Sequence, residues 1–503
     1  MQDFFKSIPH KFNPKDKALI EWAIQFASTA HKGQRRKSGE DFVNHPISAA
    51  IILAQIFPDT ATICATILHD ITEDTETTNE MVIEQFGEEI ATLVDGVTKL
   101  GHVRLLNSKD EYYVENLRKM FIATSRDVRV MLVKLSDRLH NMRTLMYLPE
   151  DKQLKIATET IEMYAPIAGR LGIGSWKDEL EDLAFKVVDS DNYKKTEDLL
   201  KAELQKREKN IKEMQKELSG ILKIEGIKFE EITGRTKRIF SLYKKLERYD
   251  GDVSKIYDLH ALRIITRSTA DCYAVLGIIH KHFNPVPGRV KDFIATPKPN
   301  GYQSIHTTVF DKTGEVFEVQ IRTDLMHETA ERGIAAHWFY AEKGKPENLE
   351  RGQKWFQELR AWQEEMAANP EEFLEGLKID FFKDRIFVLT PKGDVRDLPV
   401  GSSVIDFAFA VHSDLGYQMM GAKVNGKIAK IMDELHQGDV VEILKSKKAA
   451  TPSRDWLAAA KTGHARSLIR KYLAEHDKGL FQRVRELKLQ DISSSLPTFF
   501  RKK

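Results

Sequence analysis

Two histidines and two aspartates in the first third of the chain have the types and spacing of a metal site. His45 precedes Pro46 at an expected helix start, His69 and Asp70 close a second helix, and Asp137 lies within a third. Such residues on separate helices can converge on a divalent cation inside a bundle, and their mixed nitrogen and oxygen donors suit Mn²⁺, Fe²⁺ or Zn²⁺ better than Mg²⁺. The cation would lower the pKa of a bound water and supply a hydroxide nucleophile for a phosphate ester.

Further polar residues near these four could assist such a reaction. Glu73 and Asp74 follow Asp70 by three and four residues, near enough to orient the water or carry a proton. Asn141 follows Asp137 by four residues, so the two share one face of a helix. A single His-Asp doublet is usually a capping or core pair, but four matched positions favour a metal site. Upstream basic residues could hold the phosphates of a substrate: Arg35, Arg36 and Lys37.

A second set of charged residues lies in the middle of the chain. On a helix, the string RTKRIFSLYKKL would form a cationic face that could neutralise a triphosphate, with a solvated basic surface as the alternative. Asp258 stands at the start of one expected strand and Glu318 within another. Two carboxylates on neighbouring strands can hold Mg²⁺ against phosphates and help to deprotonate a hydroxyl. The basic and hydroxyl residues of the string are Arg235, Lys237, Arg238, Ser241, Lys244 and Lys245.

The segment RVKDFIATPKPNGYQSIHTTV combines basic residues with a turn and an aromatic side chain. Its Asn300-Gly301 pair is a strong hairpin signal. Tyr302 at such a turn could stack on a purine base, although a lone aromatic is more often a packing residue. The other polar residues of interest here are Arg289, Lys291, Lys298, Gln303 and His306.

The spacing of apolar residues predicts the elements that must position these groups. Residues 15–189 show helical periodicity, and the charged stretch 192–219 predicts a helix that bridges two domains rather than lying in a core. Short β-branched runs alternating with helical patterns then predict an α/β domain. The predicted division is 1–195 helical, 196–345 α/β, 346–380 a helical connector, 381–446 a small β-rich domain and 447–503 the start of a basic helical region.

Composition limits the classes of protein that remain. The chain has 503 residues, with 77 Lys and Arg against 75 Asp and Glu, so any nucleotide or nucleic-acid contact must come from local basic clusters. Two cysteines, Cys64 and Cys272, support neither a disulfide framework nor a zinc knuckle. Without a signal peptide or an apolar membrane segment, the sequence predicts a soluble cytoplasmic protein with no membrane partner.

Taken together, these strings resemble the RelA/SpoT family of long bacterial enzymes that make and degrade the alarmone (p)ppGpp. The matching motifs include ILHDITEDT, KLSDRLHNMRTL, GRTKRIFSLYKKL and GRVKDFIATPKPNGYQSIHTTV, and the segment from RIFVLT to GAKVNG is similar to the TGS domain of that family. The resemblance implies an all-α HD-type hydrolase, a nucleotidyltransferase-like mixed sheet and a small β-grasp-like TGS domain. The basic signature Arg289-Val290-Lys291-Asp292 is the version that accompanies bifunctional members. With two cysteines, the Cys-rich module of longer members is not expected here.

The resemblance also implies roles for individual residues. In the hydrolase, Mn²⁺ would be held by His45, His69, Asp70 and Asp137, with Glu73 and Asp74 assisting the attacking water and Arg36 and Asn141 contacting (p)ppGpp. In the synthetase, Asp258 would hold Mg²⁺, Glu318 would be the second catalytic carboxylate, and Tyr302 would stack on guanine. The ATP-binding positions are Arg235, Lys237, Ser241 and Lys245, and the GDP- or GTP-binding positions are Lys291, Lys298, Asn300 and His306.

Two other functions remain open from the sequence. One is a hydrolase whose synthetase-like domain only senses nucleotides. The other is an RNA-binding sensor, since in this family the TGS region touches uncharged tRNA on the ribosome and His412 aligns with a residue near the tRNA 3′ end. A hydrogen-bonded turn histidine is the ordinary alternative for His412. The basic tail that would contact RNA carries Arg454, Arg466, Arg470 and Lys471.

Overall fold

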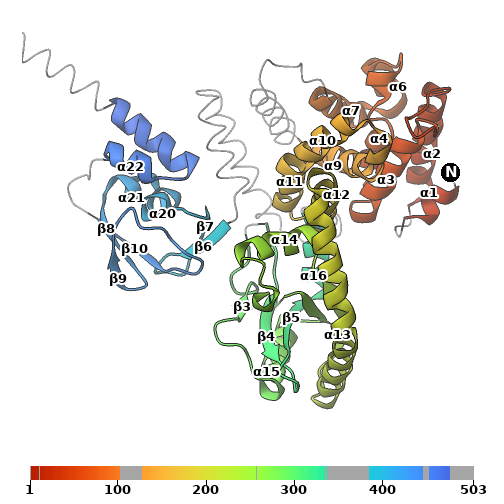
Figure 1. Cartoon of the computed structure of the whole chain (residues 1–503). Coiled ribbons are helices and arrows are strands. Elements are labelled where there is room, and N and C mark those ends of the chain that lie inside the picture. The colour runs from red at the N-terminus through yellow and green to blue at the C-terminus, as the bar shows by residue number, and fades with distance from the viewer. Residues whose placement is uncertain are drawn as a thin grey trace, which may run out of the picture. The chain divides into compact units, whose positions relative to one another are not determined.

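The computed structural model describes residues 2–8, 10, 12–101, 127–256, 258–298, 300–333, 335–336, 385–445 and 452–475. The chain divides into two compact units, residues 1–363 and 364–503, which are described separately (Figure 1). The predicted connector, residues 346–380, lies outside the described residues. No described helix is long and apolar enough to cross a membrane.

Among the described residues from 2 to 224, the regular elements are helices, as the periodicity predicts. Asp59 and Asp127 accept backbone N–H groups at the starts of α4 and α9 and so cap these helices. Helix α4 is almost entirely buried, and it packs against α3 and α9. These three helices carry or border the predicted metal residues. The helices are α1 (Gln2–Lys6), α2 (Pro14–Ala30), α3 (Asn44–Ile56), α4 (Thr60–Ile67), α5 (Ile71–Asp74), α6 (Asn79–Phe86), α7 (Glu88–Gly101), α9 (Val128–Arg143), the 3₁₀ turn η1 (Leu145–Tyr147), α10 (Glu150–Glu159), the π-helix η2 (Thr160–Tyr164), α11 (Ala165–Arg170), α12 (Gly174–Val188) and α13 (Ser190–Ile224).

A mixed five-stranded sheet follows, in the order β1-β2-β5-β4-β3. Strands β2 and β5 are parallel and the other pairs are antiparallel, which confirms the predicted mixed sheet. Apolar side chains of the sheet share a core with α15 and with part of α13. The elements are β1 (Phe229–Thr236), α14 (Ile239–Arg248), η3 (Val253–Lys255), β2 (His260–Thr266), α15 (Thr269–His282), β3 (Lys291–Asp292), β4 (Ile305–Phe310), β5 (Val316–Thr323) and α16 (Asp324–Arg332).

Helix α13 differs from its prediction as a solvated bridge. It is one helix of 35 residues, and its second half buries Met214, Leu218 and Leu222 in the core of the sheet. Charged residues on the other faces lower the mean hydropathy of this segment, so that composition hides the apolar stripe. The prediction that this helix stays out of a core was therefore wrong for its C-terminal half.

Two local predictions in the α/β part also need correction. Arg235 lies in strand β1, and helix α14 begins only at Ile239, so the basic string spans a strand end, a turn and a helix rather than one helical face. The Asn300-Gly301 pair does form a turn, with Gly301 N–H donating to the Lys298 carbonyl and Gly301 at φ +79°. This turn lies inside the long loop between β3 and β4 rather than at the tip of a tight hairpin.

Unit 2 contains the small β-rich domain that the sequence predicts. The turn at Asn425-Gly426 joins β8 to β9, and both residues have the positive φ values that a two-residue hairpin requires. Helix α20 packs in the core with residues of both sheets. The sheets have the orders β6-β7 and β10-β8-β9. The elements are β6 (Arg385–Leu389), β7 (Val395–Pro399), α20 (Val404–Val411), α21 (Ser413–Tyr417), β8 (Met419–Val424), β9 (Lys427–Ala429), β10 (Val441–Lys445) and α22 (Arg454–Ala459).

Candidate active sites

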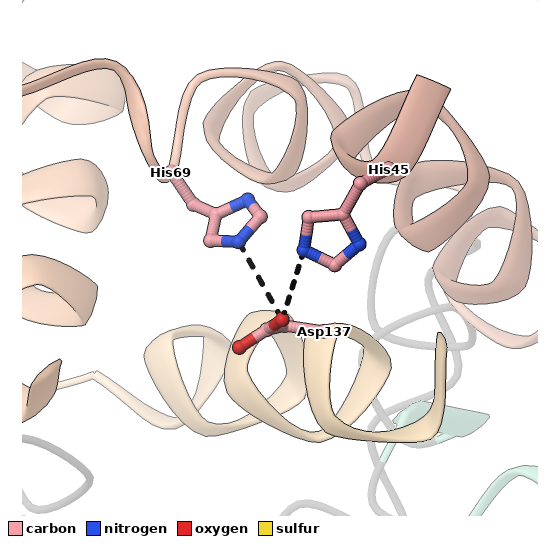
Figure 2. Close-up of side chains that lie close together, drawn as sticks. All are labelled: His45, His69 and Asp137. Carbon is pink, nitrogen blue, oxygen red and sulfur yellow. Dashed lines mark ion pairs between the residues drawn. The ribbon is translucent and has the colours of Figure 1, made fainter. Parts of the chain in front are cut away.

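Three of the four predicted metal ligands meet in the core of the helical part. His45 from α3, His69 from the turn after α4 and Asp137 from α9 each place a ligand atom within 4.8 Å of the others. Figure 2 shows both imidazoles directed at the Asp137 carboxylate, with His45 Nε2 at 3.1 Å and His69 Nε2 at 3.7 Å from Asp137 Oδ1. All three side chains are buried. Buried histidine nitrogens around a buried carboxylate are the donors of a divalent metal site.

The outer ring nitrogens of both histidines have partners elsewhere, which leaves Nε2 for the cluster. His69 Nδ1 lies 2.8 Å from the carbonyl of Thr66, and because a carbonyl only accepts, this nitrogen donates. His45 Nδ1 lies 2.7 Å from His140 Nδ1. His69 Nε2 is buried and makes no hydrogen bond within the described residues. A buried ring nitrogen beside carboxylates becomes a metal ligand once it loses its proton, so the residues present fit a bound divalent cation.

Asp70, the fourth predicted ligand, lies at the edge of the same cluster. Its Oδ1 is 3.1 Å from His69 Nε2 and its Oδ2 is 3.7 Å from His45 Nε2, with the side chain 21% exposed. The structure therefore brings all four predicted residues together. Glu73 and Asp74 follow in α5 and are exposed to solvent. The Asp74 carboxyl is partly shielded from water and lies near Asp70, and both effects raise its pKa. A raised pKa favours proton exchange at this carboxyl.

Charges around the cluster are arranged for a cation. Burial alone would lower the pKa of His69, but the carboxylates of Asp70 and Asp137 outweigh it and raise that pKa to about 9. Burial opposes the charge of Asp137, yet Lys134, 2.8 Å away, and the two histidines keep the pKa of Asp137 well below its usual range. In the metal-free protein a proton on His69 therefore supplies positive charge that a bound cation would replace.

A cavity of about 610 Å³ opens beside the cluster, and its lining includes Asp137. The predicted substrate residues Arg36, Lys37 and Asn141 line it too. Arg36 Nη2 donates to Asn141 Oδ1 at 2.7 Å, and Asn141 Nδ2 donates to Asp137 Oδ1 at 2.6 Å, so the predicted phosphate clamp is joined to the metal cluster. Sequence reasoning missed further basic residues of this wall because they lie in α10, away from any motif. They are Lys152 and Lys155.

The second predicted constellation forms on the inner strands β2 and β5 of the mixed sheet and on the segments next to them. Asp258 lies just before β2, and its Oδ2 receives Lys237 Nζ at 2.6 Å and Lys245 Nζ at 2.5 Å. Burial would raise the pKa of Asp258, but the two ammonium groups lower it to about 2. A small cavity of about 90 Å³ is lined by Asp258, Glu318, Arg235 and other residues, Ser241 among them. The two predicted carboxylates therefore face one cavity.

Glu318 belongs to a hydrogen-bonded chain with two residues of the predicted guanine site. His306 Nδ1 lies 2.7 Å from Glu318 Oε1, and Tyr302 Oη lies 2.8 Å from His306 Nε2. Because burial disfavours the charged ring, the pKa of His306 is lowered despite the carboxylate. A neutral His306 donates to Glu318 and accepts from the Tyr302 hydroxyl, so this chain orients the carboxylate.

Lys298, a predicted nucleotide-binding residue, lies between two aromatic rings. Its Nζ lies 4.8 Å from the ring centroid of Phe293 and 5.0 Å from that of Tyr302. Burial, with help from Lys291 and Arg235, lowers its pKa to about 8.

The other predicted residues of this loop contact backbone carbonyls or are exposed. Asn300 Nδ2 donates to the Gly169 carbonyl at 3.3 Å, and Gln303 Nε2 donates to the Ile294 carbonyl at 3.3 Å. Arg289 and Lys291 are exposed on the way into β3.

A larger cavity next to this site contains arginines that sequence reasoning missed. It measures about 610 Å³ and lies between α11, α12 and the sheet. Arg263 of β2 and Arg322 of β5 line it, and the Nε atom of each is buried without a hydrogen bond in the described part of the chain. Arg322 is 2% exposed. Charged residues inside otherwise apolar strands, as in HALRIIT and VFEVQIRT, are the signal that could have found them.

Comparison with known proteins finds family matches in three parts of the chain. Residues 23–174 match the HD domain family, residues 234–345 match the "Region found in RelA / SpoT proteins", and residues 386–445 match the TGS domain family. The chain is also 42% identical over 498 residues to the guanosine-3′,5′-bis(diphosphate) 3′-pyrophosphohydrolase of Aquifex aeolicus, covering 96% of this chain and 70% of that protein. The chain belongs to the RelA/SpoT family.

Two further relatives show how much of a family member this chain represents. It is 46% identical to the GTP pyrophosphokinase of Myxococcus xanthus over 92% of this chain and 61% of that protein. It is 44% identical to a probable guanosine-3′,5′-bis(diphosphate) 3′-pyrophosphohydrolase of Synechocystis over 90% of this chain and 60% of that protein. The chain thus spans about three fifths of the length of these two relatives, and both kinds of enzyme name occur among the proteins it resembles.

Proposed function

We propose that this chain is a bifunctional alarmone enzyme with two separate active sites. The helical part hydrolyses (p)ppGpp, and the mixed-sheet part synthesises it from ATP and GDP or GTP. The observation that carries the proposal is the presence within unit 1 of two distinct clusters, one of histidines and aspartates and one of carboxylates held by lysines. The names of the relatives from Myxococcus and Aquifex, one a pyrophosphokinase and one a pyrophosphohydrolase, support assigning both activities.

In the hydrolase, a water oxygen attacks the phosphorus bonded to the 3′ oxygen. The bond between this phosphorus and the 3′ oxygen breaks, which releases pyrophosphate and leaves GDP or GTP. Arg36, Lys37 and Asn141 line the cavity where the substrate phosphates would bind. Glu73 and Asp74, exposed next to Asp70, would take the proton of the water and return it to the 3′ oxygen. A divalent cation held by His45, His69, Asp70 and Asp137 would lower the pKa of that water.

In the synthetase, the 3′-hydroxyl of GDP or GTP attacks the β-phosphorus of ATP and AMP leaves. The reaction depends on charge neutralisation and alignment, which suits a site with Arg235, Lys237 and Lys245 around two carboxylates. Glu318, oriented by His306, would accept the hydroxyl proton. Tyr302 would break its hydrogen bond to His306 and stack on guanine. Asp258 would bind Mg²⁺ in place of one of its two lysine partners.

The choice of metals follows from donor chemistry and from the family. Two imidazoles with two carboxylates suit Mn²⁺ in the hydrolase, whereas an all-oxygen site of Asp258 and phosphates suits Mg²⁺ in the synthetase. Equilibrium dialysis of the chain against each metal, followed by elemental analysis, tests the first assignment. Retention of Zn²⁺ or Fe²⁺ in preference to Mn²⁺ would contradict it.

We also propose uncharged tRNA on the ribosome as a regulatory partner of unit 2. His412 is exposed at the start of α21, where its Nδ1 accepts the Asp414 N–H at 3.2 Å. Within the described residues its other nitrogen has no hydrogen bond, which leaves it available for an RNA contact. Charge reversal at exposed Arg454 should weaken binding of the full chain to tRNA, and binding should fall steeply as salt rises. Absence of tRNA retention at low salt would remove this proposal. A cytoplasmic location fits these substrates and the two cysteines, which are free and buried.

The experiment that tests the two-site proposal is product analysis of the purified chain. Incubation with ATP and GDP should yield ppGpp and AMP, and incubation with ppGpp and Mn²⁺ should yield GDP and pyrophosphate. A chain that only hydrolyses would show that the synthetase part is a nucleotide sensor.

A further inference from the structure

A third histidine, His140, contacts the ring nitrogen of His45 that does not face Asp137. It lies in α9 three residues after Asp137, and its Nδ1 is 2.7 Å from His45 Nδ1 with the ring centroids 4.8 Å apart. Arg36 Nη1 lies 3.3 Å from the same His140 nitrogen. No motif in the sequence points to this contact, because His45 and His140 are 95 residues apart.

The partners of His140 Nδ1 decide which ring carries the shared hydrogen. A guanidinium group only donates, so the contact with Arg36 makes His140 Nδ1 an acceptor. Two ring nitrogens at 2.7 Å must have one hydrogen between them, and this hydrogen therefore belongs to His45 Nδ1. His45 Nε2 is then unprotonated on the side that faces Asp137. This is the tautomer that a metal ligand requires.

We propose that His140 is a positioning residue that holds His45 in the tautomer and ring orientation for metal binding. The inference rests on the proposed metal site. The partner of His45 is a side chain, whereas His69 uses the backbone carbonyl of Thr66 for the same purpose. Side-chain partners behind metal-binding histidines fix ring orientation and raise ligand basicity, and their loss weakens metal binding roughly 10- to 100-fold.

The contacts also place His140 in a closed ring of interactions. Asp137 accepts from Asn141, Asn141 accepts from Arg36, Arg36 donates to His140, and His140 accepts from His45, which lies 3.1 Å from Asp137. Positions 137, 140 and 141 share one face of α9. One face of α9 therefore presents the metal ligand Asp137, the proposed positioning residue of His45 and the predicted substrate contact Asn141.

Two isosteric substitutions of His140 separate hydrogen bonding from packing. In His140→Asn the amide oxygen can occupy the place of Nδ1 and accept from His45. In His140→Gln the amide lies further out, near the place of Nε2, so the acceptor for His45 is lost. The direct measurement is Mn²⁺ binding to the full chain, followed by the EPR signal of free Mn²⁺. The Mn²⁺ binding that is lost in His45→Ala is assigned to the metal cluster. Circular dichroism shows whether each variant is folded.

The expected result is a Mn²⁺ Kd within about threefold of wild type for His140→Asn and roughly 10- to 100-fold weaker for His140→Gln. The matched control is His280→Leu, which should bind Mn²⁺ as wild type does. His280 is a half-buried helical histidine with one hydrogen bond to Thr307 in the sheet part. Equal Kd values for the Asn and Gln variants would overturn the inference. Wild-type protein with no Mn²⁺ site sensitive to His45→Ala would instead overturn the proposed metal site itself.

Discussion

On the proposed function, Lys298 should make binding of the guanine nucleotide depend on pH. Burial and the cations Lys291 and Arg235 lower the pKa of Lys298 to about 8 in the free protein. A bound phosphate would favour the ammonium form, so binding requires a protonated Lys298. Between about pH 7 and about pH 9 the protonated fraction falls from about 0.9 to about 0.1, and the Kd for GDP should rise about tenfold.

Isothermal titration of GDP into the full chain, without ATP, measures this change. Lys298→Arg is the matched control, because arginine stays protonated throughout the range and should remove most of the slope. A Kd that is flat across the range, or an equal slope in wild type and Lys298→Arg, would refute the reasoning.

The same pKa shift predicts an effect on folding with a definite sign. The pKa of Lys298 is lower in the folded than in the unfolded chain. Below about pH 8 the side chain is charged in both states, and its charge destabilises the folded state. This destabilisation decreases as the pH rises from about 8 and is gone above about pH 10.5. Lys298→Met should therefore raise the free energy of unfolding near neutral pH by at most about 3 kcal/mol while weakening GDP binding. Urea unfolding at neutral pH measures the first effect, and an unchanged or lower free energy of unfolding would contradict it.

Two further perturbations test the fold and the metal site. Gly333 has φ +58°, and a Cβ there would lie 2.2 Å from the Leu171 carbonyl oxygen, so Gly333→Ala should cost about 2 kcal/mol or more of stability in urea unfolding. Gly314→Ala, with φ +84° and open space, should cost only about 1 kcal/mol, and equal costs would show that the close contact is unimportant. Mn²⁺ at about 100 times its Kd should stabilise the chain by about 2.7 kcal/mol in thermal unfolding, and an equal effect in His69→Ala would contradict binding at the cluster.

The sequence predicts the metal residues well because their chemistry is carried by residue type and helical spacing. His45, His69, Asp70 and Asp137 are predicted together, and the structure brings them together. It does not predict His140, because the role of that ring depends on one nitrogen of His45 in a distant helix. Spacing along one helix cannot report such a contact.

Buried charge and concealed apolar stripes account for the other differences. Arg263 and Arg322 lie in strands whose patterns predict packing, and only the three-dimensional structure shows that both line a cavity. The second half of α13 buries Leu218 and Leu222, although its overall composition is that of a solvated helix. In both cases tertiary neighbours, rather than local composition, decide the environment.

The central claim is that two independent sites in one chain catalyse opposite reactions, and paired inactivation tests it most directly. Synthesis from ATP and GDP and hydrolysis of ppGpp are measured by thin-layer chromatography for wild type, Asp70→Ala and Asp258→Ala. The account predicts that Asp70→Ala loses hydrolysis but keeps synthesis, and that Asp258→Ala does the reverse. Loss of both reactions in either variant, with the fold intact by circular dichroism, would contradict it.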